Sequence, residues 1–298
     1  AGKTIEDTRG MFLRVARTMA AIEADYDASA DVDHWAKAFY QMISTLEFVP
    51  NSPTLMNAGR ELGQLSACFV LPVEDSIDAI FDSVKHTAQI HKSGGGTGFA
   101  FSRLRPEGDV VGSTGGVASG PVSFIKIFDA ATEQVKQGGT RRGANMGILH
   151  VEHPDVEKFI HVKDDNTSLQ NFNISLAVTD AFMTALESGG DYDLINPHSG
   201  EVTAQLSARA LFDDITRSAH KTGDPGMIFI DKINAQNPTP ALGKIESTNP
   251  CGEQPLLPYE SCNLGSINLN KVLRPGTGSG GVQGLEIDWD KLGEIVAL

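Results

Sequence analysis

Residues 66–104 read SACFVLPVEDSIDAIFDSVKHTAQIHKSGGGTGFAFSRL, and they define the architecture of the chain. Apolar, β-branched and aromatic residues fill 67–73 and 97–104, as is typical of strands. Residues 76–92 between them have apolar side chains at helical spacing, a polar N-cap candidate in front and a glycine beyond the end. A strand, a helix and a strand in succession predict an α/β fold with a mostly parallel sheet or barrel.

The same alternation continues toward the C-terminus. Further strands are expected at residues 145–151, 172–178, 227–230 and 262–269. Further helices are expected from Pro121 to a stop at Gly138, and at 154–162, 180–186 and 208–219. Helical patterns at 11–22 and 33–46 precede the first strand. We therefore assign residues 1–47 to an N-terminal helical segment and residues 48–298 to the α/β part.

Composition excludes several classes of function. The chain has 298 residues, of which 40% are hydrophobic and 21% charged, as in a soluble globular protein. Its net charge of −14 argues against a surface for duplex nucleic acid, which needs clustered Lys and Arg. No apolar run is long enough to span a bilayer. Three cysteines are too few for a disulfide scaffold, so we expect a reducing, cytoplasmic compartment.

Both ends of the sequence suggest a piece of a longer protein. It begins at Ala1 rather than at Met, and residues 288–298 have helical apolar spacing without a stop signal. We therefore expect a fragment that ends within a helix.

The three cysteines lie in motifs that favour chemistry on a substrate. Cys251 stands in residues 249–253 (NPCGE), between an amide and a carboxylate two residues away on either side. Cys68 and Cys262 could supply a redox pair. Structural zinc is an alternative, but no closely spaced pair of Cys or His residues supports it. Inert buried thiols are the other alternative, which is strongest for Cys68 inside an apolar strand.

Two glycine-rich stretches suit a nucleotide ligand. Residues 92–98 (KSGGGTG) join a helix to a strand, where glycine lets a ligand approach the backbone closely. Residues 134–143 (QVKQGGTRRG) combine one Lys, two Arg and three Gly in an acidic chain, which favours phosphate or nucleotide binding. The alternatives are a helix cap with a turn for the first stretch and a solvated basic turn for the second. The histidines show no spacing typical of a metal site.

Six motifs occur in an order that resembles the catalytic chain of ribonucleotide reductase. They are residues 51–54 (NSPT), 67–68 (AC), 94–98 (GGGTG), 138–143 (GGTRRG), 249–253 (NPCGE) and 261–265 (SCNLG). The wording of residues 249–258 (NPCGEQPLLP) is most similar to the adenosylcobalamin-dependent, class II enzymes. The resemblance covers nearly the whole chain beyond Phe48.

The resemblance implies a ten-stranded α/β barrel made of two five-stranded halves, with a radical-bearing cysteine on a loop through its centre. Residues 1–47 would be the family's N-terminal helical segment. Residues 48–298 would be about the first half of the barrel, including the central loop and truncated at the C-terminus.

The resemblance also implies a role for each thiol. Cys251 would form the thiyl radical that removes the 3′-hydrogen of a ribonucleotide. Glu253 would accept the 3′-hydroxyl proton, and Asn249 would hydrogen-bond the ribose hydroxyls. Cys68 and Cys262 would deliver two electrons, protonate the departing 2′-hydroxyl and finish as a disulfide. Because a disulfide needs close approach, we expect these two cysteines on adjacent strands.

Further site residues follow from the same motifs. The substrate pocket would be lined by Ser52, Ala67, Cys68, Gly96, Asn249, Pro250, Cys251, Gly252 and Glu253. A deoxynucleotide effector would be bound by Asp75, Arg103, Lys136, Arg141 and Arg142. No metal ligands are assigned.

The implied activity is the reduction of ribonucleotides to 2′-deoxyribonucleotides for DNA synthesis. Adenosylcobalamin is the implied cofactor, and a thioredoxin-like reductant and a second copy in a homodimer are the implied partners. Neither a nucleic acid polymer nor a membrane is expected as a partner. The alternatives are a class I large chain, which depends on a metal-containing partner subunit, a glycyl-radical lyase on the same barrel, and a nucleotide-binding module without catalysis. The thiol pair favours the reductase, because a glycyl-radical lyase needs no such pair.

Overall fold

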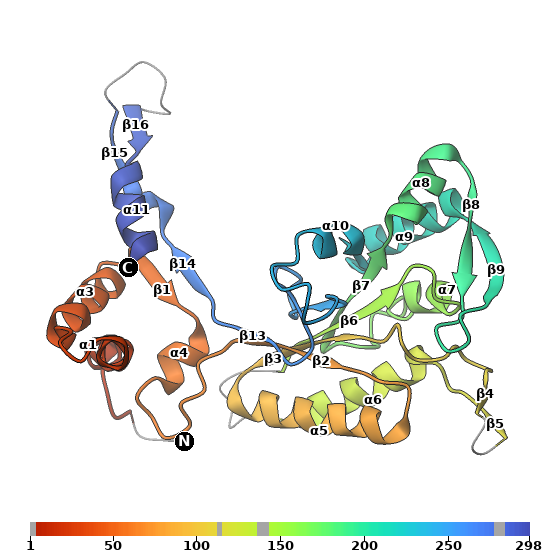
Figure 1. Ribbon diagram of the computed structural model, residues 1–298, viewed down its shortest axis with the longest axis horizontal. Coiled ribbons are helices and arrows are strands. Elements are labelled where there is room, and N and C mark those ends of the chain that lie inside the picture. The colour runs from red at the N-terminus through yellow and green to blue at the C-terminus, as the bar shows by residue number, and fades with distance from the viewer. Residues whose placement is uncertain (1–3, 112–114, 136–142, 277–283) are drawn as a thin grey trace. The chain divides into compact units, whose positions relative to one another are not determined.

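A computed structural model describes residues 4–111, 115–135, 143–276 and 284–298 (Figure 1). These residues form two compact units. One consists of Ala1–Ala67 together with Asn263–Leu298, and the other of Cys68–Cys262. All three cysteines belong to the second unit.

A six-stranded sheet forms the centre of the unit Cys68–Cys262. Its strand order is β10-β7-β6-β3-β2-β13. The strands are β2 (Cys68–Pro72), β3 (Gly96–Ala100), β6 (Asn145–His150), β7 (Phe172–Val178), β10 (Gly226–Phe229) and β13 (Ser261–Cys262). Strands β2 to β10 are parallel neighbours in chain order, whereas β13 returns antiparallel to β2. The predicted α/β fold with a mostly parallel sheet is therefore confirmed. Neighbours in simple chain order are the arrangement of a barrel wall, because a doubly wound sheet reverses its order at a switch point.

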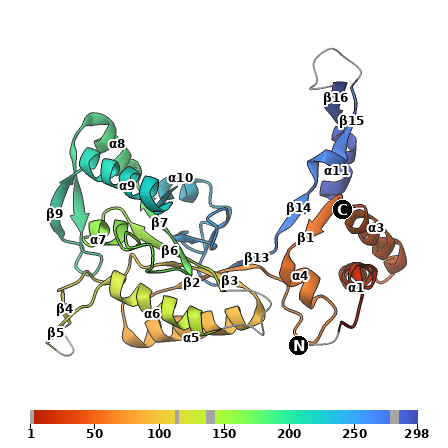
Figure 2. The ribbon, with the colours of Figure 1, turned by 180° about the vertical axis from the view of Figure 1, so that it is seen from behind.

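Five helices of the described residues cover one face of this sheet. They are α5 (Ile77–Ser93), α6 (Pro121–Gln134), α7 (Val156–Ile160), α8 (Asp180–Ser188) and α9 (Ala208–Thr222). Helix α10 (Ile230–Ala235) follows β10, and its Ile230 packs with Met146, Ile148 and Ala177 on the other face. The main core lies between the sheet and these helices, where the rings of Phe99 and Phe128 have their centroids 4.8 Å apart at a tilt of 60°. Figures 1 and 2 show α5 and α6 side by side from opposite directions.

Helix α5 illustrates why these segments fold as predicted. The hydroxyl oxygen of Ser76 caps its start by accepting a hydrogen bond from the Ala79 amide at 3.2 Å. Gly94 ends it with a φ of 97°, a conformation that residues with a Cβ rarely adopt. Ile80 on the apolar side of the helix is fully buried in the core.

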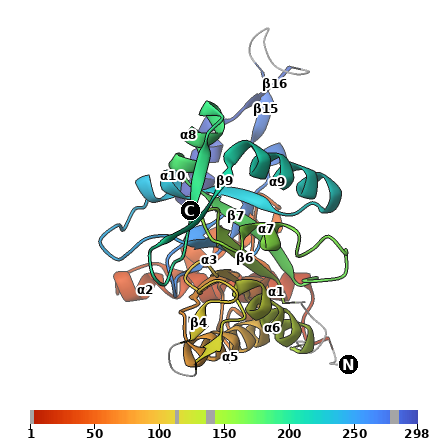
Figure 3. The same ribbon diagram turned by 90° about the vertical axis from the view of Figure 1, so that its right-hand side faces the viewer.

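Three small antiparallel pairs complete this unit. They are β4 (Val110–Val111) with β5 (Gly116–Val117), β8 (Asp191–Ile195) with β9 (Val202–Ser207), and β11 (Ser247–Thr248) with β12 (Pro255–Leu256). Strand β8 contacts α8, and strand β9 contacts α9 (Figure 3). None of these pairs was predicted, because β4, β5, β11 and β12 have two residues each and β9 is largely exposed. Strand β8 was missed although Tyr192 and Leu194 alternate with polar residues and are buried in the core.

The other unit is built on helices. It contains α1 (Thr8–Ala20), α2 (Glu23–Tyr26), α3 (Val32–Ser44), α4 (Ser52–Asn57), the 3-10 helix η1 (Leu269–Val272) and α11 (Trp289–Ala297). Its strands are β1 (Phe48–Pro50), β14 (Gly265–Ile267), β15 (Leu273–Pro275) and β16 (Leu285–Ile287), paired as β1 with β14 and β15 with β16. Val15 and Ile43 form its core with Ala58.

Two local features were not expected from the sequence. Residues 52–57 form helix α4, because the Asn51 side chain accepts a hydrogen bond from the Thr54 amide at 2.8 Å and Pro53 lies in the first turn. The single strand expected at 262–269 is two strands, β13 and β14, which pair in different sheets. Gly265 allows the second pairing, because any Cβ there would collide with the Phe48 ring.

Candidate active site

Cys251 lies in the turn between β11 and β12. Ser247 and Thr248 of the first strand pair with Leu256 and Pro255 of the second. Asn249 closes the turn with two hydrogen bonds to Gln254, both at 3.0 Å. The backbone N–H of Asn249 donates to the Gln254 carbonyl oxygen, and the side-chain Oδ1 of Asn249 accepts from the backbone N–H of Gln254. We call residues 247–256 the cysteine hairpin.

The cysteine hairpin rests on the sheet face opposite α5 and α6, and glycines make room for it. A Cβ at Gly98 of β3 would collide with the carbonyl oxygen of Thr248. A Cβ at Gly96 would lie 2.6 Å from the Pro250 ring. The Asn173 amide of β7 donates to the Pro250 carbonyl oxygen at 2.7 Å. The glycine-rich start of β3 therefore admits the protein's own backbone at this point.

Cys68 and Cys262 face each other across β2 and β13. They are directly opposed in the antiparallel register, and both are free thiols. Opposed residues in such a pair have Cα atoms about 4.5–5.5 Å apart, which lies in the range that a disulfide spans. The prediction that these cysteines lie on adjacent strands is confirmed.

The environment of Cys262 keeps it protonated. Burial is the largest cause of a pKa raised well above the ordinary value for a thiol, and a hydrogen bond with Cys68 adds to it. The nearby charge of Glu253 acts in the same direction. Cys262 is therefore a thiol, not a thiolate, at neutral pH.

Asn249 joins the cysteine hairpin to the thiol pair. Its side chain is fully buried, and its Nδ2 donates to the sulfur of Cys68 at 3.2 Å. The same side chain thus fixes the turn that carries Cys251 and one member of the pair. A single amide links two of the three thiols.

The remaining predicted substrate residues fall into three positions. Cys251 and Glu253 are exposed on the turn, with the half-buried Gly252 between them at a φ of 86°. Ala67 is buried and directly precedes Cys68. Ser52 begins α4 in the other compact unit, so the structure does not place it against the thiols.

One expectation about the hairpin differs from the structure. A radical-bearing thiol is expected to be shielded from water, yet Cys251 is exposed. The hairpin contacts β3, β6 and β7, and Cys251 is exposed on the turn at its end.

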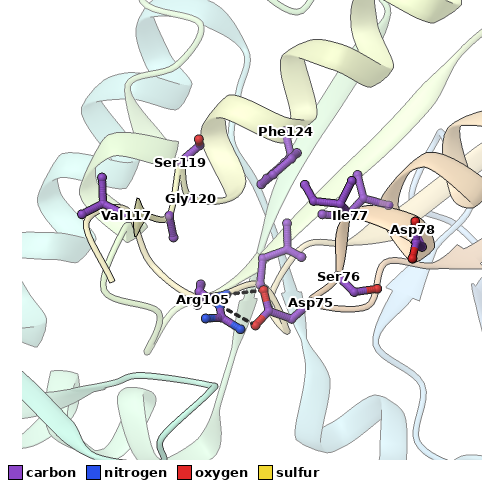
Figure 4. Close-up of a pocket in the computed structure, with 12 residues that line it drawn as sticks. Asp75, Ser76, Ile77, Asp78, Arg105, Val117, Ser119, Gly120 and Phe124 are labelled. Carbon is purple, nitrogen blue, oxygen red and sulfur yellow. Dashed lines mark hydrogen bonds and ion pairs between the residues drawn. The ribbon is translucent and has the colours of Figure 1, made fainter. Parts of the chain in front are cut away.

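A second potential site is a cavity of about 470 Å³ at the other end of β2 and β3. Figure 4 shows Asp75 and Arg105 joined on one side of it, with Nε of Arg105 donating to Oδ2 of Asp75 at 2.8 Å. Ile77 and Phe124 supply apolar lining. Nδ1 of His198 lies 3.5 Å from Oδ2 of Asp75.

The structure distributes the predicted effector residues unevenly. Asp75 lines the cavity, whereas Arg103 pairs with Glu74 and, at 2.9 Å, with Glu246. Lys136, Arg141 and Arg142 lie outside the described residues. Sequence reasoning missed Arg105, because nothing in the local pattern distinguishes it from Arg103, and only the fold places it beside Asp75.

The described residues contain neither a candidate metal site nor a candidate membrane-spanning helix. No group of three or more His, Cys, Asp or Glu side chains in this part of the chain could hold a metal ion. Among the same residues, no helix has both the length and the apolar character needed to cross a membrane.

Comparison with known families agrees with this geometry. Residues 66–298 match the family described as "Ribonucleotide reductase, barrel domain", and residues 1–63 match the one described as "Ribonucleotide reductase, all-alpha domain". The barrel match alone spans most of the chain.

Curated relatives point the same way. A vitamin B12-dependent ribonucleoside-diphosphate reductase of Thermoplasma acidophilum is 60% identical over 264 residues, covering 88% of this chain and 33% of that protein. One of the same name from Mycobacterium tuberculosis is 50% identical over 298 residues, covering 100% of this chain and 42% of that protein. The ribonucleoside-diphosphate reductase large subunit of Dictyostelium discoideum is 32% identical over 333 aligned positions.

The chain spans between 33% and 42% of the length of the first two relatives. The two matched domains, the strand order of a barrel wall and the opposed cysteines agree with one another. This chain belongs to the ribonucleotide reductase family.

Proposed function

We propose that this chain, within a protein of its relatives' length, reduces ribonucleotides to 2′-deoxyribonucleotides. The observation that carries the proposal is the arrangement of three thiols around one amide. Asn249 donates to Cys68, Cys68 opposes Cys262, and Cys251 stands on the turn that Asn249 closes. A reversible dithiol pair beside a separate reactive thiol suits a two-electron reduction begun by a radical.

The proposed steps balance in atoms and electrons. A thiyl radical at Cys251 takes the 3′-hydrogen of the ribose, and Glu253 accepts the proton of the 3′-hydroxyl. The 2′-hydroxyl leaves as water with a proton from the thiol pair. Cys68 and Cys262 also give their second hydrogen to C2′, supply two electrons in all and form a disulfide. Glu253 returns its proton to the 3′-oxygen, and Cys251 finally returns a hydrogen atom to C3′, which restores its thiyl radical.

The protonation of Cys262 supports its place in this sequence. Since its pKa is raised by burial and by Cys68, the group holds a proton at neutral pH that it can give to the leaving hydroxyl. A thiolate at this position could not act as the acid. Asn249 supports the oxidation step, because its N–H can stabilise negative charge that develops on the Cys68 sulfur.

We propose adenosylcobalamin as the radical source. The thiol of Cys251 is exposed on the turn, so a large cofactor could reach it. When bound, this cofactor would supply the hydrogen-abstracting radical that activates Cys251. Several of the relatives bear "vitamin B12-dependent" in their names, which supports the choice over a class I partner subunit.

The cavity at Asp75 and Arg105 suits a deoxynucleotide effector. The Asp75 carboxylate can accept hydrogen bonds from sugar hydroxyls, and the Arg105 guanidinium can donate to phosphate. Ile77 and Phe124 offer apolar contact for a base. We further propose a thioredoxin-like reductant for the Cys68–Cys262 disulfide, a homodimer as the assembly, and the cytoplasm as the reducing compartment.

The test is an assay of the full-length protein. With adenosylcobalamin as the sole radical source and a dithiol as reductant, conversion of ribonucleotide to deoxyribonucleotide is expected. Cys251→Ser should abolish it, whereas Cys68→Ser should stop multiple turnover but still allow a radical to form at Cys251. Activity that appears only with an added metal-containing subunit would refute the cofactor proposal, and full turnover by Cys68→Ser would refute the redox pair.

A further inference from the structure

His91 is a buried imidazole that the proposed chemistry does not use. It lies in the last turn of α5 with 2% of its surface exposed. Its Nε2 is 3.1 Å from the hydroxyl of Thr97. The Thr97 hydroxyl donates to Oδ1 of Asn145 at 2.6 Å, and Nδ2 of Asn145 donates to the Thr132 hydroxyl at 2.9 Å. This buried chain, which we call the His91 network, connects α5, β3, β6 and α6.

The direction of each hydrogen bond follows from its neighbours. The Asn171 carbonyl oxygen can only accept, so it faces Nδ2 of Asn145 at 3.2 Å, and Oδ1 of Asn145 faces Thr97. Thr97 therefore uses its one proton on Asn145. The proton between Thr97 and His91 must come from Nε2 of the imidazole.

The imidazole is thus neutral and protonated at Nε2. Burial lowers the pKa of His91 to about 4, which agrees with a ring that carries a single proton. Its other nitrogen, Nδ1, is buried and has no hydrogen-bond partner among the described residues. A Cβ at Gly143 would lie only 2.7 Å from this atom, so the ring fits tightly against backbone.

The His91 network anchors the strand segment on which the cysteine hairpin rests. Thr97 lies between Gly96 and Gly98, and successive residues of a strand face opposite sides. The two glycines contact Pro250 and Thr248 of the hairpin, whereas the Thr97 hydroxyl points to His91 and the helices. His91 therefore hydrogen-bonds β3 from the face opposite the one that contacts the cysteine hairpin.

We propose that His91 is a positioning residue for Cys251, acting through Thr97 and the backbone of β3. The inference rests on the proposed role of Cys251. It requires the Nε2–H donor at its observed position rather than the mere bulk of a side chain. Loss of that donor would let the start of β3 shift. Because Gly96 and Gly98 contact the hairpin without intervening side chains, the hairpin would then no longer be held in one position.

The test compares matched variants of the whole chain. His91→Leu keeps the bulk but removes the donor, and His91→Gln places an amide N–H near the position of Nε2. Thr97→Val removes the hydroxyl that receives the bond. Thr87→Val is the control, because Thr87 is buried one turn earlier in α5 and its hydroxyl donates only to the Ser83 carbonyl oxygen.

Two measurements report on the hairpin without any turnover. They are amide hydrogen exchange at Asn249 and Gly252, whose N–H groups bond within the turn, and the rate of Cys251 alkylation by iodoacetamide. His91→Leu and Thr97→Val should accelerate both by about threefold to tenfold, the effect of one lost hydrogen bond. His91→Gln and Thr87→Val should match the unaltered chain.

Several results would overturn the proposal. Unchanged rates in both His91→Leu and Thr97→Val would do so, as would equal rates in His91→Gln and His91→Leu. If His91→Leu does not fold, Thr97→Val against Thr87→Val decides the question. Because both readings are taken without substrate or cofactor, a full-length protein that fails to reduce ribonucleotides would refute the proposed function and leave this result standing.

Discussion

Asn249 performs two tasks that ordinary substitutions can separate. Its Oδ1 accepts from Gln254 and closes the turn, while its Nδ2 donates to the sulfur of Cys68. An aspartate has the same shape and keeps the first bond but has no N–H for the second. The residue therefore allows the geometry of the hairpin to be tested apart from the chemistry of the thiol pair.

We predict that Asn249→Asp slows oxidation of the Cys68–Cys262 pair by roughly tenfold, because the sulfur loses its donor and gains a carboxylate neighbour. The rate of disulfide formation with an oxidised dithiol, followed by mass spectrometry, measures this. Amide exchange of Gly252 should stay as in the unaltered chain, since the turn bond to Gln254 is kept. An oxidation rate equal to that of the unaltered chain would show that the Asn249–Cys68 bond is irrelevant to the pair.

His91 also gives a prediction for stability against pH. Its pKa is 6.5 when the chain is unfolded and about 4 when folded. Below pH 6.5 the unfolded chain binds a proton that the folded chain does not, so folding stability falls as pH drops toward 4 and levels off below it. The loss is on the order of 3 kcal/mol from this group.

Urea denaturation between pH 4 and 7 measures the effect as a difference between the unaltered chain and His91→Gln. The variant cannot titrate in this range, so the stability of the unaltered chain relative to the variant should fall by about 3 kcal/mol as pH drops from 6.5 to 4. Parallel curves over that range would contradict a neutral, buried His91. Carboxylates elsewhere titrate in both proteins and cancel in the difference.

At the scale of elements, glycines of β3 decide where the cysteine hairpin packs. A Cβ at Gly98 would collide with the backbone oxygen of Thr248, an atom that no side-chain rotation can move. We predict that Gly98→Ala displaces the hairpin and destabilises the chain by about 2–4 kcal/mol, the range for overpacked cores and lost buried contacts.

Gly190→Ala is the matched control, because the nearest atom to its Cβ would be the Ser188 hydroxyl at 3.4 Å, an ordinary contact. It should change the free energy of unfolding by less than about 0.5 kcal/mol, because the added methyl group meets no close atom. Urea denaturation of both variants gives the comparison. Equal stabilities would show that β3 has room for the added methyl group.

Periodicity and caps were enough to predict the long elements of the sheet unit. Helix α5 runs from its Ser76 cap to its Gly94 stop as expected, and the strands near Cys68, Gly96 and Asn145 begin within one residue of the expected positions. Strand β3 nevertheless ends at Ala100, four residues before the expected end at 104. Apolar repeats and helix caps are local signals, so a single sequence contains them.

Short elements and the partners of charged groups could not be predicted. Strands β11 and β12 have two residues each, too few to show a period, and they form because Asn249 closes the turn between them. Arg103 and Arg105 look alike in sequence, and only the fold places one beside Asp75 and the other between Glu74 and Glu246. Arg103 and Glu246 are 143 positions apart in the sequence, so their pairing depends on tertiary packing.

At the scale of the whole unit Cys68–Cys262, β2 and β3 run from one candidate site to the other. Cys68 and Gly96 begin these strands at the thiol pair, and Asp75 and Arg105 follow their far ends at the cavity. Two parallel, hydrogen-bonded strands of a packed sheet are a stiff connection. An effector that moves the ends of β2 and β3 therefore has a direct physical route to the reduction site.

The cavity end of this route can be tested through its two arginines. We predict that Arg105→Gln weakens binding of a deoxynucleoside triphosphate by about tenfold or more, because a charge-assisted bond to phosphate is lost. Arg103→Gln is the matched control: it removes an equal charge two residues away, but its guanidinium is engaged by Glu74 and Glu246 outside the cavity lining. Calorimetric titration of the full-length protein measures both. Stronger weakening by Arg103→Gln than by Arg105→Gln would move the effector site away from this cavity and restore the assignment that the sequence motif alone suggests.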